Sequence, residues 1–389
     1  MTDAPDSDRQ VPSLSPTVLR RRLREGDPLA VLDVRDREEF EAWHVDGEHV
    51  EATQIPYAKF MAAKVKGTAA DLVADLAEPI LVVCGEGKAS AFVAETLLDA
   101  GVEAMNLEEG MDGWARVYET VELPHDEATV LQYQRPSSGC LAYLVVGDGE
   151  AVVVDPLRAF ADRFVADARE RGAELVAAVD THVHADHVSG VRDVARETGC
   201  DVVLPSGSRD RGLAFDARLL DDGESVAVGD VELTALATPG HTTEATSLRL
   251  GDLLFCGDTV FLDGVARPDL EVGEAGAEEM ARTLYRTVHD RFFALPPTTR
   301  VAPGHFGDAT TPDEHGAYVA TLADLRERLA ALSMDEDEFV EFSVSHMPPQ
   351  PANYETIVET NLGRHEADEE EAFELELGPN NCAVAGAAN

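Results

Sequence analysis

The sequence has very little positive charge. Its 389 residues include 31 Lys and Arg against 75 Asp and Glu, a formal net charge of −44, and the only lysines are Lys59, Lys64, Lys66 and Lys88. Nucleic acid and anionic membranes are bound through basic surfaces, so neither is an expected partner. Acidic groups spread along the whole chain repel one another unless salt screens them. We interpret this composition as adaptation to a very salty cytoplasm, as in halophilic organisms; an acidic mesophilic protein is the alternative.

Cysteine and long apolar runs are also scarce. The five cysteines are widely spaced and none belongs to a C-x-x-C pair, so neither a disulfide framework nor a Cys-rich zinc site is expected. No stretch approaches the roughly 18 uncharged apolar residues of a membrane span. The first ten residues, MTDAPDSDRQ, lack the basic and apolar regions of a secretory signal. We therefore expect a cytoplasmic protein.

The length indicates more than one domain, because a domain typically has roughly 100–200 residues. Residues 11–120 have the pattern of an α/β unit. Apolar, β-branched runs at 31–34 and 78–85 predict buried strands, and 88–101 predicts a helix after a tight glycine turn. Strand, turn and helix in this order are typical of a parallel sheet.

The second domain is predicted from a change in periodicity. Residues 121–128 are expected to be a linker, and three strands separated by turn residues open a domain at 129–333. This domain continues with alternating helices and strands and is expected to end in a long helix at 316–333. Residues 334–389 form a C-terminal extension, in which we expect a solvated acidic run at 365–376 and a loose terminus at 381–389.

Cys84 is a candidate nucleophile because it lies where a predicted strand ends and a helix begins. Backbone N–H groups in such a loop, together with the helix N-terminus, favour a thiolate and any anion attached to it. Attack by sulfur, with a persulfide held in the loop, suits this position; a buried structural cysteine is the alternative. The loop residues that would hold the anion or persulfide are Gly85, Glu86, Gly87, Lys88, Ala89 and Ser90.

The first domain resembles a single-domain rhodanese, a sulfurtransferase module. The segments that carry the resemblance are DVRDREEFEAWHVDGE, ILVVCGEGKAS and MNLEEGMDGW. The resemblance implies an α/β domain with a parallel sheet and helices on both faces, and Cys84 as the persulfide carrier. The sequence departs from the rhodanese pattern at two positions that affect which sulfur donor can bind. Ala89 stands where the family often has Arg, and Glu86 places negative charge where an anionic donor such as thiosulfate must approach.

A second chemical site is predicted from THVHADHVSG, which follows a predicted strand. It offers four potential metal ligands within six residues, and three more follow later β-rich runs. Imidazole and carboxylate together suit zinc or iron, whereas calcium and magnesium prefer oxygen alone. A surface histidine run is the alternative. The seven candidates are His182, His184, Asp186, His187, His241, Asp258 and His305.

This pattern resembles the metallo-β-lactamase superfamily, which implies an αββα sandwich of two sheets covered by helices. TVFLDGVARPDLE, MPPQPANYETIVETNLG and LELGPNNCAV further resemble persulfide dioxygenases. That resemblance implies oxidation of a small thiol persulfide by O2 to sulfite at one Fe(II). The implied iron ligands are His182, His241 and Asp258.

The resemblance implies one of two roles for the other four candidates. They surround and orient the iron ligands, or they form a second, unfilled metal position. These residues are His184, Asp186, His187 and His305. Arg267 is a further candidate, for binding the carboxylate end of the thiol substrate, because arginine recognises carboxylates through two bonds. An ion pair with Asp263 or Asp269 is the alternative for Arg267.

Another enzyme class can use the same ligands. In a hydroxyacyl-thiolester hydrolase of the glyoxalase II type they hold two zinc ions bridged by Asp258, and a metal-bound hydroxide attacks the carbonyl. The rhodanese-like domain favours the dioxygenase, because it makes or consumes a persulfide. A third hypothesis is that the rhodanese-like domain has no catalytic role and serves only as a recruitment or docking module. The presence of Cys84 in its loop argues against this hypothesis. The sequence leaves open the thiol, the sulfur donor and the oligomeric state, with a homodimer as one option.

Overall fold

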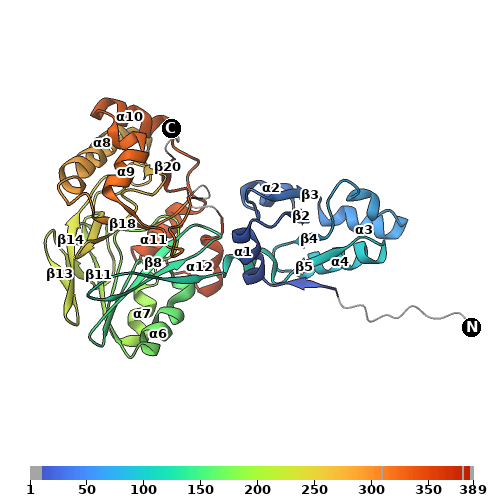
Figure 1. Ribbon diagram of the computed structural model, residues 1–389, viewed down its shortest axis with the longest axis horizontal. Coiled ribbons are helices and arrows are strands. Elements are labelled where there is room, and N and C mark those ends of the chain that lie inside the picture. Colours follow the sequence, from blue (N-terminus) through green and yellow to red (C-terminus); the bar gives the residue numbers. More distant parts are fainter. Residues whose placement is uncertain (1–10, 308–309, 379–380, 386–389) are drawn as a thin grey trace, which may run out of the picture. The chain divides into compact units, whose positions relative to one another are not determined.

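The computed structural model describes residues 11–307, 310–378 and 381–385. The chain forms two compact units, Met1–Val117 and Tyr118–Asn389 (Figure 1). Within the described ranges, no helix combines the length and apolar character needed to cross a membrane.

The first unit is built on a parallel sheet with strand order β1-β5-β4-β2-β3. Alternate residues along a strand face opposite sides, so Leu32 packs in one apolar cluster and Val31 in the other. Helices α3 and α4 cover the first face, and α1 and α5 the second. The expected sheet with helices on both faces is confirmed. The elements are β1 Ser13–Leu14, α1 Pro16–Glu25, β2 Leu29–Asp33, α2 Arg37–Ala42, β3 Val50–Gln54, α3 Tyr57–Lys66, β4 Ile80–Val83, α4 Lys88–Asp99, β5 Ala104–Leu107 and α5 Gly110–Ala115.

The second unit contains two large sheets that face each other. The first has the order β12-β11-β10-β9-β8-β7-β6 and the second β13-β14-β15-β16-β18-β19. The first comprises β6 Glu119–Leu123, β7 Thr129–Gln134, β8 Leu141–Gly147, β9 Glu150–Val154, β10 Glu174–Val179, β11 Asp201–Pro205 and β12 Arg218–Leu220. The second comprises β13 Ser225–Val228, β14 Val231–Ala237, β15 Thr246–Leu250, β16 Leu253–Gly257, β18 Arg300–Pro303 and β19 Ala320–Thr321.

Helices cover the outer faces of these sheets and complete the expected αββα sandwich. Helices α6 (Ala161–Glu170) and α7 (Val191–Thr198) pack on Val153 and its neighbours, whereas the adjacent Val152 faces the core between the sheets. Helices α8 (Gly273–Arg286) and α10 (Glu336–Ser345) contribute to the apolar cluster of the second sheet. The loops between strands and helices meet at one edge of the sandwich, where the candidate ligands lie.

Two predictions around the second unit were wrong. The expected linker at 121–128 lies inside the second unit, and its first three residues belong to β6, which pairs with β7 and places Leu123 opposite Val130. The long helix expected at 316–333 is divided. Residues up to Thr321 run as loop and edge strand, and the helix proper, α9, covers only Leu322–Arg328. Thr321 and Asp324 form a capping box, which fixes the start of the helix at this point.

The C-terminal extension is also more ordered than expected. The acidic run contains helix α12 (Glu369–Leu375), and its Phe373 is buried. Helix α11 (Tyr354–Asn361) precedes it. The predicted loose terminus includes strand β20 (Ala383–Ala385), which pairs with β17 (Gly264–Ala266). Residues 386–389 of that prediction lie outside the described residues.

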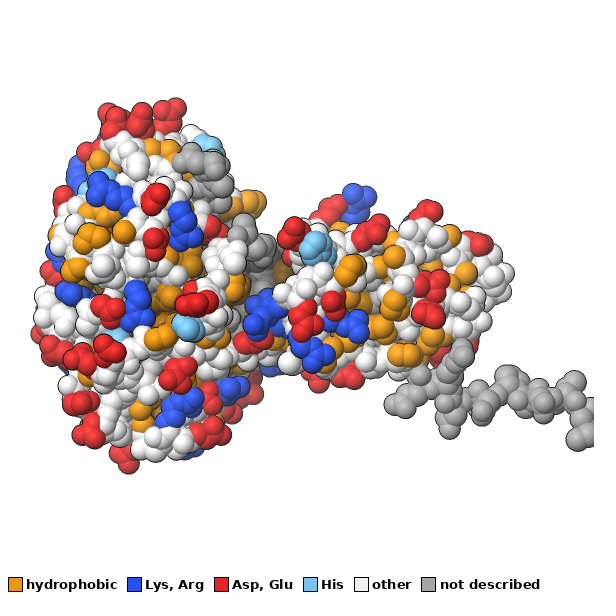
Figure 2. All heavy atoms as spheres, viewed as in Figure 1, with side chains coloured by type: hydrophobic (Ala, Val, Ile, Leu, Met, Phe, Trp, Pro, Cys, Tyr) orange, Lys and Arg blue, Asp and Glu red, His pale blue; other side chains and the backbone are white. Residues whose placement is uncertain are grey.

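The distribution of charge leads to a prediction about salt. Figure 2 shows Asp and Glu side chains scattered over the visible face of both units. At about 0.1 M ionic strength the Debye length is about 10 Å, so neighbouring carboxylates repel; at about 1 M it is about 3 Å. We therefore expect the thermal unfolding midpoint to rise steeply with KCl between about 0.1 and 2 M.

An osmolyte series is the control for this measurement, because an uncharged osmolyte strengthens burial without screening charge. A midpoint that rises with the osmolyte and stays flat with KCl would contradict the interpretation of the acidic composition as salt adaptation.

Candidate metal centre

All seven predicted metal ligands are buried at one end of the sandwich, at loops that follow strands. His182 follows β10, His241 follows β14, Asp258 follows β16 and His305 follows β18. Their exposed fractions, and those of the other three candidates, range from 1% to 8%. The alternative of a surface histidine run is therefore wrong.

His182, His241 and Asp258 form one compact group. Their ligand atoms all lie within 4.8 Å of one another. The Nε2 atoms of His182 and His241 are 3.9 and 3.8 Å from Asp258 Oδ2. All three atoms are buried, and within the described part of the chain none has a hydrogen-bond partner. Buried polar atoms are normally paired, so this set fits a metal ion held by two imidazoles and one carboxylate.

The opposite ring nitrogens hold both histidines in the orientation that a metal requires. His241 Nδ1 lies 2.9 Å from the carbonyl oxygen of Arg267, and His182 Nδ1 lies 3.0 Å from the Thr181 hydroxyl. That hydroxyl donates to Asp155, so it can accept a hydrogen bond from Nδ1–H of His182. The Nε2 lone pair of His182 then remains free for a metal. Burial holds the pKa of His182 well below its usual value, which keeps the ring neutral.

Asp258 is held as a carboxylate. Burial opposes its ionisation, but the charge and hydrogen bond of His305 outweigh burial and lower the pKa well below its usual range. His305 Nδ1 lies 2.6 Å from Asp258 Oδ1, which leaves Oδ2 facing the two histidines. Gly304 makes this geometry possible, because a Cβ there would collide with Asp258 Oδ1.

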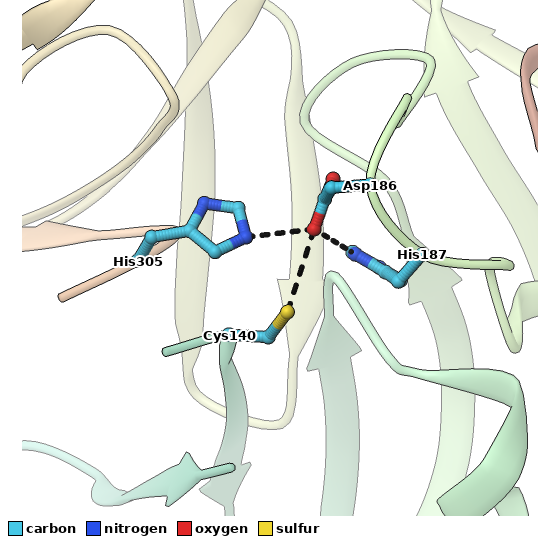
Figure 3. Close-up of side chains that lie close together, drawn as sticks. All are labelled: Cys140, Asp186, His187 and His305. Carbon is cyan, nitrogen blue, oxygen red and sulfur yellow. Dashed lines mark hydrogen bonds and ion pairs between the residues drawn. The ribbon is translucent and has the colours of Figure 1, made fainter. Parts of the chain in front are cut away.

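The other candidates lie beside this group. His184 Nε2 contacts Asp155 at 3.1 Å, while its Nδ1 has no hydrogen-bond partner among the described residues. Asp186, His187 and His305 form a second group, which also includes Cys140 (Figure 3). Sequence reasoning missed both Cys140 and Asp155. The available signal was their position, since Asp155 directly follows a buried strand and Cys140 precedes one.

The C-terminal extension holds the loop that carries the clustered ligands. Asn361 at the end of α11 donates to the carbonyl oxygens of His184 and His187, at 3.0 and 2.9 Å. Its side-chain oxygen Oδ1 accepts a hydrogen bond from the N–H of Ser189. Glu376, after α12, accepts from the Val188 N–H and lies 3.1 Å from an Arg135 nitrogen. The extension is therefore part of the centre.

Arg267 has a structural role, which contradicts the expected binding of a substrate carboxylate. It is 1% exposed, and its Nε and Nη2 atoms donate to Asp269 at 2.8 and 3.1 Å. Its Nη1 atom donates to the carbonyl oxygens of Pro349 and Asn381. The alternative of an ion pair with Asp269 is the one seen, although the pair is buried. Arg267, which directly follows β17, thereby connects that strand to the C-terminal extension through hydrogen bonds.

Arg267→Ala is expected to destabilise the protein strongly. Removing one partner of a buried ion pair leaves the other charge unpaired, which costs about 3–5 kcal/mol. Arg286→Ala is the matched control, because Arg286 pairs with Glu336 and is 57% exposed; exposed pairs contribute about 1 kcal/mol or less. Chemical denaturation of both variants measures the difference. Equal losses of unfolding free energy in the two variants would contradict the structural role of Arg267.

Cys84 lies where the sequence places it, between β4 and the first residue of α4. Its Sγ is 3.1 Å from the Ser90 hydroxyl and accepts a hydrogen bond from the Ser90 N–H at 3.3 Å. Of the other loop residues, Gly87 is buried, and Gly85 and Ala89 are partly buried. Glu86 and Lys88 are exposed and form an ion pair. This pair reduces the net positive charge that an anionic sulfur donor would meet.

Comparison with known proteins supports the fold assigned to each of the two units. The rhodanese-like domain model matches residues 15–117, and the metallo-beta-lactamase superfamily model matches residues 136–332. The chain is 33% identical over 239 residues to the mitochondrial persulfide dioxygenase ETHE1 of Homo sapiens, covering 59% of this chain and 86% of that protein. It is 37% identical over 161 residues to hydroxyacylglutathione hydrolase of Methylococcus capsulatus, covering 41% of this chain and 58% of that protein.

A solved structure supports the same assignment. The crystal structure of ETHE1 from Myxococcus xanthus matches with a TM-score of 0.53 and 28% identity, covering 60% of this chain and 98% of that one. The chain therefore belongs to the metallo-β-lactamase superfamily, and it joins a rhodanese-like domain to a domain similar to persulfide dioxygenases.

Proposed function

We propose that the second unit oxidises a small thiol persulfide with O2 and water to sulfite and the free thiol. The observation that carries the proposal is the group of three facing, buried and unpartnered ligand atoms from His182, His241 and Asp258, described above. Two imidazoles and one carboxylate suit a single Fe(II), which supplies open positions for the substrate sulfur and for O2. The similarity to persulfide dioxygenases over most of their length supports this choice.

The residues of the chain prepare the centre for this chemistry. Neutral His182 and ionised Asp258 present lone pairs to one point, and the hydrogen bonds behind them fix their orientation. The His305 N–H donates a hydrogen bond to the Asp258 oxygen that faces away from the metal position. All of these groups are buried.

We also propose that the first unit transfers sulfane sulfur on Cys84. The Cys84 thiolate attacks the outer sulfur of a donor persulfide, the S–S bond of the donor breaks, and the donor leaves as its thiol. The Ser90 N–H and hydroxyl lie within reach of the sulfur and would hold the resulting Cys84 persulfide. The ion pair between Glu86 and Lys88 favours a small thiol persulfide over thiosulfate as the donor.

The alternative is a zinc-dependent hydroxyacyl-thiolester hydrolase, with the rhodanese-like domain as a docking or regulatory module. The free Nδ1 of His184 favours it, because that atom is available as a further ligand. The similarity to hydroxyacylglutathione hydrolase of Methylococcus capsulatus covers 58% of that protein, against 86% for the human persulfide dioxygenase.

Metal analysis and O2 consumption distinguish the two functions. Protein purified without oxygen and loaded with iron is expected to consume O2 only when a thiol persulfide is supplied, with a rate proportional to bound iron. The zinc-loaded protein is expected to hydrolyse no hydroxyacyl thiolester. Absence of persulfide-dependent O2 uptake in the iron-loaded protein, together with thiolester hydrolysis by the zinc form, would establish the alternative.

A further inference from the structure

Helix α3 of the first unit carries an apolar stripe on its exposed side. Met61 and Val65 are 46% and 89% exposed, and among the described residues only one other large apolar side chain is exposed. Ala58 and Ala62 are exposed on the same helix. The four residues follow the i, i+3, i+4, i+7 spacing that places side chains on one face of a helix. Grouped exposed apolar side chains, unlike scattered ones, indicate an interaction surface.

The core of the first unit does not use this stripe. The opposite side of α3 supplies the buried Phe60 and Ala63, which belong to the same apolar cluster as Cys84. Helix α4 lies beside α3 on this face of the sheet (Figure 1), and the rings of Tyr57 and Phe92 meet edge to face with centroids 5.6 Å apart. The stripe is therefore left over once α3 has packed against the sheet and α4.

Positive charge flanks the stripe on both sides. Three of the four lysines of the chain lie on α3, which contains no acidic residue. From the helical spacing, Lys64 lies on one side of the stripe, and Lys59 and Lys66 lie on the other. The Lys64 Nζ is 4.3 Å from the centroid of the Phe92 ring and 3.9 Å from a Glu95 carboxylate oxygen, and these contacts hold it beside the stripe.

This combination favours a protein helix as the partner. A small anion would contact the lysines alone and leave Met61 and Val65 in water. Two amphipathic helices, in contrast, pair through apolar stripes and select each other through the charges that flank them. The small side chains of Ala58 and Ala62 allow a second helix to approach closely.

The charge of the face decides which kind of helix fits. Lysines on both sides of the stripe complement acidic side chains at the matching positions of the partner. A symmetric contact between two copies of the chain through α3 is disfavoured, because it would place the same lysines against one another. The complementary partner is therefore acidic and different from α3 itself.

We propose that the exposed face of α3 is a docking site for an acidic amphipathic helix of another protein. The apolar side chains of that helix pack on Met61 and Val65, and its carboxylates pair with the flanking lysines. The proposal is independent of the reaction assigned to Cys84, because none of the exposed α3 side chains belongs to the Cys84 loop.

A synthetic helix is the probe. The fluorescent peptide has about three heptads with leucine at positions a and d and glutamate at e and g, and its twin has glutamine at e and g. Anisotropy titrations use the full-length protein at the lowest KCl concentration that keeps it folded, with labelled peptide too dilute to self-associate. The protein is expected to bind the glutamate peptide at least about 10-fold more tightly than the glutamine peptide.

Variants of the exposed face test each half of the proposal. Lys59→Gln combined with Lys66→Gln is expected to weaken binding of the glutamate peptide about 5–30-fold, since each exposed ion pair contributes up to about fivefold. The same variant is expected to bind the glutamine peptide as the wild type does. Met61→Ser combined with Val65→Ser is expected to abolish binding of both peptides.

Arg21→Gln combined with Arg37→Gln is the matched control. It removes the same charge from exposed positions of the same unit, on α1 and α2, and is expected to leave both affinities unchanged. The proposal is overturned if the wild type does not bind the glutamate peptide, or if the arginine variant loses as much affinity as the lysine variant. A wild-type dimer that Met61→Ser with Val65→Ser dissociates would also overturn it, because the occupant of the face would then be a second copy of this chain.

Discussion

Asp258→Ala and His182→Ala are each expected to abolish persulfide-dependent O2 uptake and to lose the catalytic iron at the same time. Each change leaves two of the three ligands that are typical of Fe(II) oxygenases with open positions, and two ligands hold the metal weakly. Asp258→Ala also removes the acceptor of the His305 N–H. Iron content and O2 uptake, measured on the same anaerobic preparation, test both losses.

His187→Ala is the matched control, because His187 is equally buried but lies outside the group of three. It is expected to retain the catalytic iron and to lower activity by about 10–100-fold. This is the usual loss when a residue beside the metal ligands, which does not bind the metal itself, is removed. Complete loss of iron from His187→Ala would place this histidine among the iron ligands. Such a result would favour the binuclear hydrolase over the dioxygenase.

The candidate site could be predicted from sequence where its chemistry is local. His182, His184, Asp186 and His187 lie within six residues, and Cys84 lies at a strand-to-helix turn, so short patterns identify both. His241, Asp258 and His305 were found because each follows a β-rich run. In a layered α/β fold, residues at such positions meet at one edge.

The parts of the candidate site that could not be predicted from sequence depend on contacts between distant segments of the chain. Asn361 and Glu376 lie in the C-terminal extension, where the sequence predicts a solvated acidic run at 365–376 but no contact with the ligands. Only the fold brings these two residues to the loop around His187. Arg267 carries the charge of a substrate-binding residue, but the extension buries it against Asp269 and two carbonyl oxygens. A motif identifies residue types, whereas burial decides whether a charged group remains available to a ligand.

The length of the helix after β18 could not be predicted for a related reason. Apolar spacing at residues 316–333 is compatible with one continuous helix, yet β19 pairs with β18 and places Ala320 opposite Val301. Pairing with a sheet edge offers backbone hydrogen bonds that outweigh a weak local helix preference. The capping box at Thr321 then sets the boundary.

Cys84→Ser is expected to abolish sulfur transfer between small thiols and to leave oxidation of a directly supplied persulfide largely intact. A serine hydroxyl is not ionised near neutral pH and cannot form a persulfide, whereas a thiolate does both. The two reactions are assigned to separate compact units, Met1–Val117 and Tyr118–Asn389. Sulfur transfer to a thiol acceptor and O2 uptake with purified persulfide are measured on the same variant.

Ser90→Ala separates the role of the loop from that of the nucleophile. It removes the hydroxyl 3.1 Å from Cys84 Sγ but keeps the Ser90 backbone N–H, which donates to the same sulfur. A charge-assisted hydrogen bond contributes about 1.5–3 kcal/mol, so we expect a loss of transfer of about 10–100-fold and no change in O2 uptake. If O2 uptake with supplied persulfide also collapses in a folded Cys84→Ser protein, Cys84 takes part in the oxidation itself. The assignment of one reaction to each unit would then be wrong.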